Sequence, residues 1–175
     1  MQDAILNSFL TRQYEAGRSL ADSSDLVDLE PLGPAPVRLY MLRLRCKGLV
    51  REPSGAVVEA DRFDIGIRFP DDYLRHVNPA EVVTWIGPMN AHHPQVRPPF
   101  VCVGRVTPGT SLVDLIYQLF EIVTYTKVTM REDDALNHDA CVWARRNLHR
   151  LPIDRRPLKR PVALPRQPRS EEPGR

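Results

Sequence analysis

The stretch FDIGIRF (residues 63–69) decides the fold, because apolar and other residues alternate in it with the two-residue period of a half-buried strand. The same alternation runs through VRLYMLRLRC (residues 37–46), and VVTWIG (residues 82–87) supplies a further apolar run. No helical pattern of adequate length separates these runs, and a parallel pairing would need a crossover of a dozen or more residues. They therefore predict an antiparallel meander with a turn at residues 53–55 and a short fourth strand near residues 26–29.

Helical periodicity flanks these strands on both sides. Residues 5–14 carry apolar side chains three to five positions apart, which predicts an N-terminal amphipathic helix ending near Gly17. Ser111 and Asp114 form a capping-box-like helix start. One apolar face follows, at positions 112, 115, 116, 119, 120 and 123. With a last helix expected at residues 137–148, the order of helix, strands, proline-rich segment and two helices indicates an α+β domain.

Length and composition favour one globular domain. The chain has 175 residues, of which 42% are apolar and 26% charged, enough for one ordinary core. We assign this domain to residues 1–150. No stretch approaches the roughly 18 consecutive apolar residues of a membrane span, and the N-terminal MQDAILNSFL has no apolar signal region. We expect a cytoplasmic protein without a membrane partner.

The C-terminal residues 151–175 differ in composition from the rest. They hold seven basic and three acidic residues and six of the 17 prolines. Such a segment lacks the periodic apolar residues that offset the entropy of ordering, which predicts a disordered or extended tail. Its charge would suit nucleic acid or an acidic partner surface. A solvated tail is the simpler interpretation, so we do not expect nucleic acid as a partner.

Three cysteines, Cys46, Cys102 and Cys141, stand at wide spacings without a CxxC pair. An odd number in this arrangement suggests neither a disulfide framework nor a zinc knuckle. Cys102 ends the stiff stretch HHPQVRPPFVCVG (residues 92–104), which contains three prolines. Two interpretations of Cys102 are open: a small buried hydrophobe in an apolar run, or a thiol held at the surface for covalent chemistry.

Five motifs, taken together, resemble those of ubiquitin-conjugating (E2) enzymes. In chain order they are FPDDY (69–73), HPQ (93–95), VCV (101–103), PGTSLVDLIYQLFEIV (108–123) and EDDALN (132–137). They follow the order and nearly the spacings of that family, and the resemblance covers residues 37–148. It implies the UBC fold: an N-terminal helix, a four-stranded antiparallel meander, a cysteine-bearing active-site segment and two helices.

The resemblance implies a function for Cys102. The matching thiol in the family accepts the C-terminal carbonyl of a ubiquitin-like protein from an E1 enzyme and passes it to an amine of a target protein. A thioester is reactive enough for this transfer without a metal or cofactor, because the thiolate is a good nucleophile and leaving group. ATP is used by the E1 partner. The expected partners are therefore a ubiquitin-like protein, an adenylating E1-like enzyme and target proteins.

Three further positions match family site residues. Asp134, which lies 32 residues after Cys102, would orient an incoming lysine and help it lose a proton, or would serve as an acid at a helix N-terminus. His93 matches a histidine that is mainly structural, and a catalytic base is the weaker alternative. Gln95 stands where the family has Asn and would support the oxyanion if its longer side chain fits. His92 suggests a metal, but further ligands at useful spacing are missing.

Departures from the family pattern indicate a divergent, bacterial type of E2-like protein. Gln95 replaces the family Asn, residues 106–108 read VTP in place of a WSP-type turn, and Leu74 replaces a common Pro. Similar proteins occur in bacterial antiphage operons with a ubiquitin-like protein, an E1-like enzyme and often a JAB-family peptidase. The same departures allow an alternative: an inactive E2-like binding module that docks the ubiquitin-like protein or its E1.

Overall fold

The computed structural model describes residues 4–161 of the chain. Its elements, in order, are α1 (Ala4–Asp22), β1 (Val27–Leu32), β2 (Leu39–Leu44), β3 (Gly48–Arg51), β4 (Val57–Ala60), β5 (Phe63–Arg68), α2 (Pro79–Val82), β6 (Val83–Gly87), β7 (Val96–Arg97), β8 (Phe100–Val101), α3 (Leu112–Val123), the 3-10 turn η1 (Glu132–Asp134), α4 (His138–Arg146) and the 3-10 turn η2 (Leu148–Arg150). This order confirms the predicted α+β class.

The main sheet has four antiparallel strands in the order β1-β2-β5-β6. Leu42 of β2 lies opposite Leu29 of β1 and Ile65 of β5, and Ile65 lies opposite Trp85 of β6. The side chains of Leu42 and Ile65 are fully buried. The alternation of residues 63–69 and 37–46 thus corresponds to one buried face of neighbouring strands.

A second hairpin, formed by β3 and β4, lies between β2 and β5 in the sequence and was not predicted. The predicted turn at residues 53–55 is part of its loop, where the Gly55 N–H bonds to the Glu52 carbonyl at 2.9 Å. Strand β1 is longer than predicted and contains Pro31. Proline is tolerated there because β1 is an edge strand, where one side needs no ladder hydrogen bonds.

Helix α1 continues to Asp22, so the predicted end near Gly17 is wrong. Gly17 is needed for packing instead. A Cβ atom at this position would lie 2.7 Å from Leu112 of α3 and 2.8 Å from Leu29 of β1. The glycine therefore lets α1 approach both elements, at the modest cost in helix propensity that an interior glycine carries.

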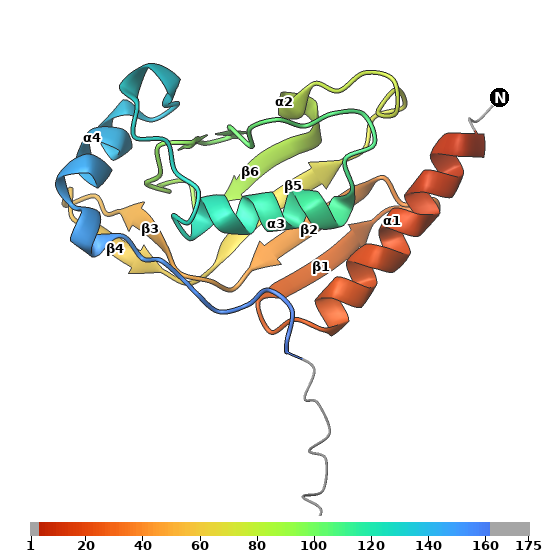
Figure 1. Ribbon diagram of the computed structural model, residues 1–175, viewed down its shortest axis with the longest axis horizontal. Coiled ribbons are helices and arrows are strands. Elements are labelled where there is room, and N and C mark those ends of the chain that lie inside the picture. Colours follow the sequence, from red (N-terminus) through yellow and green to blue (C-terminus); the bar gives the residue numbers. More distant parts are fainter. Residues whose placement is uncertain (1–3, 162–175) are drawn as a thin grey trace, which may run out of the picture.

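Helix α3 lies across one face of the main sheet, with α1 alongside β1 (Figure 1). Its predicted apolar face is buried: Leu112, Leu115, Ile116, Leu119, Phe120 and Val123. The Ser111 side chain accepts a hydrogen bond from the Asp114 N–H at 3.0 Å, which confirms the predicted cap. A second bond joins α3 to α1, because Gln13 Oε1 accepts the Leu112 N–H at 2.8 Å.

Residues 151–161, here called the C-terminal arm, pack on the folded body. The arm crosses the molecule from α4 towards the end of α1 (Figure 1), where the Arg160 N–H donates to the Ser23 carbonyl at 2.8 Å. Asp154 and Leu158 are buried. The arm is therefore extended and packed, and the interpretation of a solvated tail does not hold for it; residues 162–175 of the predicted tail lie outside the described residues.

We expect Asp154→Asn to loosen the C-terminal arm and to lower the free energy of unfolding by about 2 kcal/mol near neutral pH. Arg156 donates to the Asp154 carboxylate at 2.6 Å and the Lys47 N–H at 3.1 Å, which together lower its pKa to about 2. This stabilisation is present above the ordinary carboxyl pKa and is lost as the pH falls towards 2. Urea unfolding at pH 7 measures it, with exposed Asp61→Asn as control; equal losses would contradict the prediction.

No helix within residues 4–161 combines the length and the apolar character needed to cross a bilayer.

Candidate functional site

A small hairpin positions Cys102 beside the main sheet. Strands β7 and β8 pair with each other, and the Trp85 N–H of β6 donates to the Pro99 carbonyl at 2.8 Å, which attaches this hairpin to the sheet edge. Cys102 follows β8 directly. Its neighbours Val101 and Val103 are buried, so the alternation of an extended chain directs Cys102 outward.

Cys102 is the exposed thiol among the three cysteines, since Cys46 and Cys141 are buried. Burial raises the pKa of Cys46 to about 12, with a further contribution from the nearby Asp154 carboxylate. A thiol with so high a pKa is almost never a thiolate at neutral pH. The exposure of Cys102 excludes its interpretation as a buried hydrophobe and leaves the thiol accessible to another protein.

Gln95 holds the backbone of Cys102 through two hydrogen bonds. The Cys102 N–H donates to the Gln95 carbonyl at 2.8 Å, and Gln95 Nε2 donates to the Cys102 carbonyl at 3.0 Å. The Gln95 side chain is long enough to make this contact across the shortened loop. Its Oε1 is buried and accepts no hydrogen bond from the described residues, an arrangement that costs stability and that folded proteins seldom keep without a role.

His93 supports the same loop from inside. It is 4% exposed, and its Nδ1 accepts the Gln95 N–H at 3.0 Å. Its ring packs edge-on against Tyr125, with 4.3 Å between ring centroids. Burial, with a smaller contribution from His92, lowers the pKa of His93 to about 3. A neutral, buried ring with Nδ1 engaged in this way fits the structural interpretation of His93 better than that of a catalytic base.

Asp134 is exposed and ends the 3-10 turn η1. Its carboxylate lies 3.4 Å from Arg131 Nε. Helix α4 begins only at His138, with Asn137 as its N-cap, so Asp134 lies outside the first turn of that helix and belongs to the single turn of η1. An exposed carboxylate paired with one arginine is weakly held and remains available to a partner's cation.

The segment that carries Asp134 is tied to the loop of residues 93–95. The Asn137 N–H donates to the Pro94 carbonyl at 3.0 Å, next to Gln95. Direct hydrogen bonds thus join Cys102, Gln95 and His93, whereas Asp134 is linked to them through the backbone three residues downstream. Three of the four predicted site residues, Cys102, Gln95 and His93, therefore lie in one hydrogen-bonded region.

His92 is held by a backbone hydrogen bond and by an aromatic neighbour. Its backbone N–H donates to the Leu49 carbonyl at 2.8 Å, and its ring packs against Trp143 with 5.7 Å between centroids. Burial, and then the nearby Arg51, lower its pKa. Within the described part of the chain, no group of three or more His, Cys, Asp and Glu side chains is arranged to hold a metal ion.

Two residues of this region were not singled out from the sequence, Tyr125 and Lys127. The Tyr125 hydroxyl donates to the His92 carbonyl, and its ring covers His93. Tyr125 has a φ of 57°, which turns the chain at the end of α3 and brings residues 125–127 back to the cysteine segment. No periodic pattern marks these positions, because a tertiary turn and not a regular element places them.

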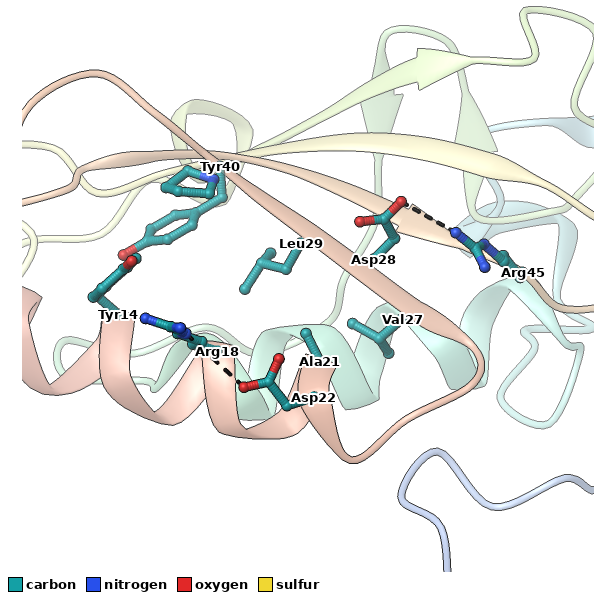
Figure 2. A pocket seen from close by; sticks show the side chains of 10 residues that line it. Tyr14, Arg18, Ala21, Asp22, Val27, Asp28, Leu29, Tyr40 and Arg45 are labelled. Atoms are coloured by element: carbon teal, nitrogen blue, oxygen red, sulfur yellow. Dashed lines mark hydrogen bonds and ion pairs between the residues drawn. The ribbon is translucent and has the colours of Figure 1, made fainter.

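A separate pocket of about 360 Å³ lies between α1 and β1 (Figure 2). Tyr14 and Tyr40 lie on one side of it, and the ion pairs Arg18–Asp22 and Arg45–Asp28 lie along its rim. The lining residues come from α1, from the first two strands and from Arg45 directly after β2, and none belongs to residues 92–104. The pocket is therefore distinct from the Cys102 region.

No family model matches this chain, and the comparison with curated proteins gives no match either. The function must therefore be argued from the residues and their geometry.

Proposed function

We propose that this chain is an E2-like conjugating enzyme of the UBC-fold type. Cys102 accepts a ubiquitin-like protein from an E1-like enzyme as a thioester and transfers it to an amine of a target protein. The observation that carries the proposal is the exposed Cys102 thiol, whose backbone N–H and carbonyl are both hydrogen-bonded to Gln95 of the HPQ motif. The order of helix, four-stranded sheet, cysteine segment and two helices supports it.

The chemistry needs few groups. Cys102 Sγ attacks the activated carbonyl carbon of the E1-bound modifier, and the E1 thiolate leaves. In the second step an amine nitrogen attacks the new thioester, the C–S bond breaks and the thiolate returns to Cys102. One amine proton passes to water or to a nearby carboxylate, for which Asp134 is the candidate. Positioning supplies much of the rate, because thioester and amine meet as neighbours.

The departures from the family pattern support a bacterial, cytoplasmic setting for this activity. Residues 106–108 (VTP) and Leu74 change surfaces where an E3 ligase would dock. We propose that the protein works with a ubiquitin-like protein and an E1-like enzyme of the same operon, with a JAB-family peptidase as a further partner, in antiphage defence.

A charging assay tests the proposal. We expect the chain, incubated with ATP and with the E1-like enzyme and ubiquitin-like protein encoded beside it, to form an adduct that DTT removes. Cys102→Ala abolishes this adduct, whereas Cys141→Ala retains it because Cys141 is buried. Gel electrophoresis with and without DTT reads the outcome. A DTT-sensitive adduct that persists in Cys102→Ala would overturn the assignment of Cys102.

The second candidate is a binding module without transfer activity. Gln95 Nε2 favours it, because this donor bonds to the Cys102 carbonyl and thus is committed to the chain itself. Calorimetric binding of the ubiquitin-like protein or E1, with no DTT-sensitive adduct at saturating E1, would support this candidate over the enzyme.

A further inference from the structure

A lysine side chain lies beside the cysteine segment. A Cβ atom built on Gly104 would lie 3.5 Å from Lys127 Nζ, so the ammonium group sits directly over this glycine. Gly104 is two residues from Cys102. Its φ of 77° is in the left-handed region that favours glycine, which leaves this position without a side chain. The Lys127 ammonium therefore approaches the backbone of the cysteine segment unhindered.

Cys102 and Gly104 are close together in the chain, and both are exposed at the surface. Val103 between them is 1% exposed, whereas both Cys102 and Gly104 are exposed. Two residues of chain span at most about 7 Å between Cα atoms. The Lys127 nitrogen therefore lies over an exposed segment two residues from the Cys102 thiol, and rotation of its four-carbon stem moves it along this segment.

Lys127 is anchored by its backbone and free at its tip. Its N–H donates to the Glu121 carbonyl at 2.9 Å, which fixes the residue at the end of α3. No carboxylate of residues 4–161 lies within the 4.0 Å of an ion pair with its ammonium. By contrast, the Lys47 ammonium lies 3.7 Å from Glu59. The Lys127 amine beside the cysteine segment is therefore not held by an acid of the described residues.

We propose that Lys127 is an intramolecular acceptor for the modifier carried on Cys102. The Lys127 ammonium first gives one proton to water. Its nitrogen then attacks the thioester carbonyl carbon, the C–N bond forms, the C–S bond breaks, and the leaving Cys102 thiolate takes the second nitrogen proton and returns as the thiol. The product is an isopeptide-linked modifier at Lys127. This inference rests on the proposed function, since it requires the thioester. The attached modifier covers the face around Cys102 and so restrains further charging of the same molecule.

The test needs few variants, because the chain has three lysines, Lys47, Lys127 and Lys159. Wild type and the single Lys→Arg variants at these three positions are charged with E1-like enzyme, ATP and ubiquitin-like protein, and then incubated without an added amine. Each sample is divided: one half is analysed without DTT to measure the thioester, and the other with DTT to measure the isopeptide. Arginine keeps the positive charge and removes the nucleophilic amine.

We expect Lys127→Arg to form the DTT-sensitive thioester as wild type does and to lose at least about tenfold of the DTT-resistant adduct, whereas Lys47→Arg and Lys159→Arg retain it. Tryptic peptides of the wild-type adduct carry the modifier remnant on Lys127. A normal thioester without a DTT-resistant adduct, or with an adduct that maps to another amine, overturns the inference and leaves the proposed function intact. Absence of any thioester overturns both.

Discussion

Replacing His93 with asparagine is expected to reduce the protein's sensitivity to mild acid sharply, and His92, whose pKa is also lowered by burial, accounts for part of the sensitivity that remains. In wild type, the free energy of unfolding should fall by about 2–3 kcal/mol between about pH 6.5 and pH 4.5, and in His93→Asn it should fall much less. The cause is the burial that lowers the pKa of His93 to about 3, with His92 adding to it.

The sign follows from proton linkage. In the unfolded chain a histidine has a pKa of about 6.5 and binds a proton as the pH falls below that value. The folded state binds this proton only near pH 3, because Nδ1 already accepts the Gln95 N–H and the ring is buried. Between these values the unfolded state holds more protons, so stability is complete above about pH 6.5 and falls on acidification by about 1.4 kcal/mol per pH unit.

Asparagine is the informative replacement, because its Oδ1 stands near the place of Nδ1 and still accepts a hydrogen bond while carrying no titrating group. The variant should be less stable than wild type at pH 7.5, since the ring contact with Tyr125 is lost. Urea unfolding at several pH values measures both effects. Exposed His76→Asn is the control and should keep the wild-type slope; an unchanged slope in His93→Asn would refute the explanation.

Strands and helices with long periodic patterns were predictable from the sequence. Short strands and close contacts between elements distant in the sequence were not. The alternation around Ile65 and the apolar face of α3 correspond directly to buried surfaces. The β3–β4 hairpin has strands of four residues, too short for a period to stand out. Gly17 looked like a helix end because glycine often ends helices, whereas its packing against Leu112 depends on a residue far away in the sequence.

The candidate site, too, was predictable only in part. The order of the motifs indicated Cys102, Gln95, His93 and Asp134, but the exposure and the protonation of these side chains depend on neighbours in three dimensions. Whether the thiol is exposed depends on the burial of Val101 and Val103 on either side of it. The neutral state of His93 depends on tertiary burial, which sequence spacing does not encode.

Gln95 sets the position of the proposed nucleophile, so Gln95→Ala is expected to slow transfer from Cys102 to an added amine by about 30- to 100-fold. The backbone bond from Cys102 to the Gln95 carbonyl remains in this variant, so the protein stays folded. What is lost is the donor to the Cys102 carbonyl at 3.0 Å, and with it the restraint on the peptide that follows the thiol.

Gln95→Asn separates side-chain length from amide chemistry. It restores the residue type of the E2 family but retracts the amide by about 1.5 Å, one carbon–carbon bond, from the Cys102 carbonyl. We therefore expect it to behave as Gln95→Ala does. Single-turnover discharge of preformed thioester to free lysine measures the rate apart from charging by the E1-like enzyme, and Gln118→Ala on α3 is the control. The shorter asparagine side chain does not reach the Cys102 carbonyl from the same backbone position. A fully active Gln95→Asn would therefore mean that the amide acts without a hydrogen bond to that carbonyl.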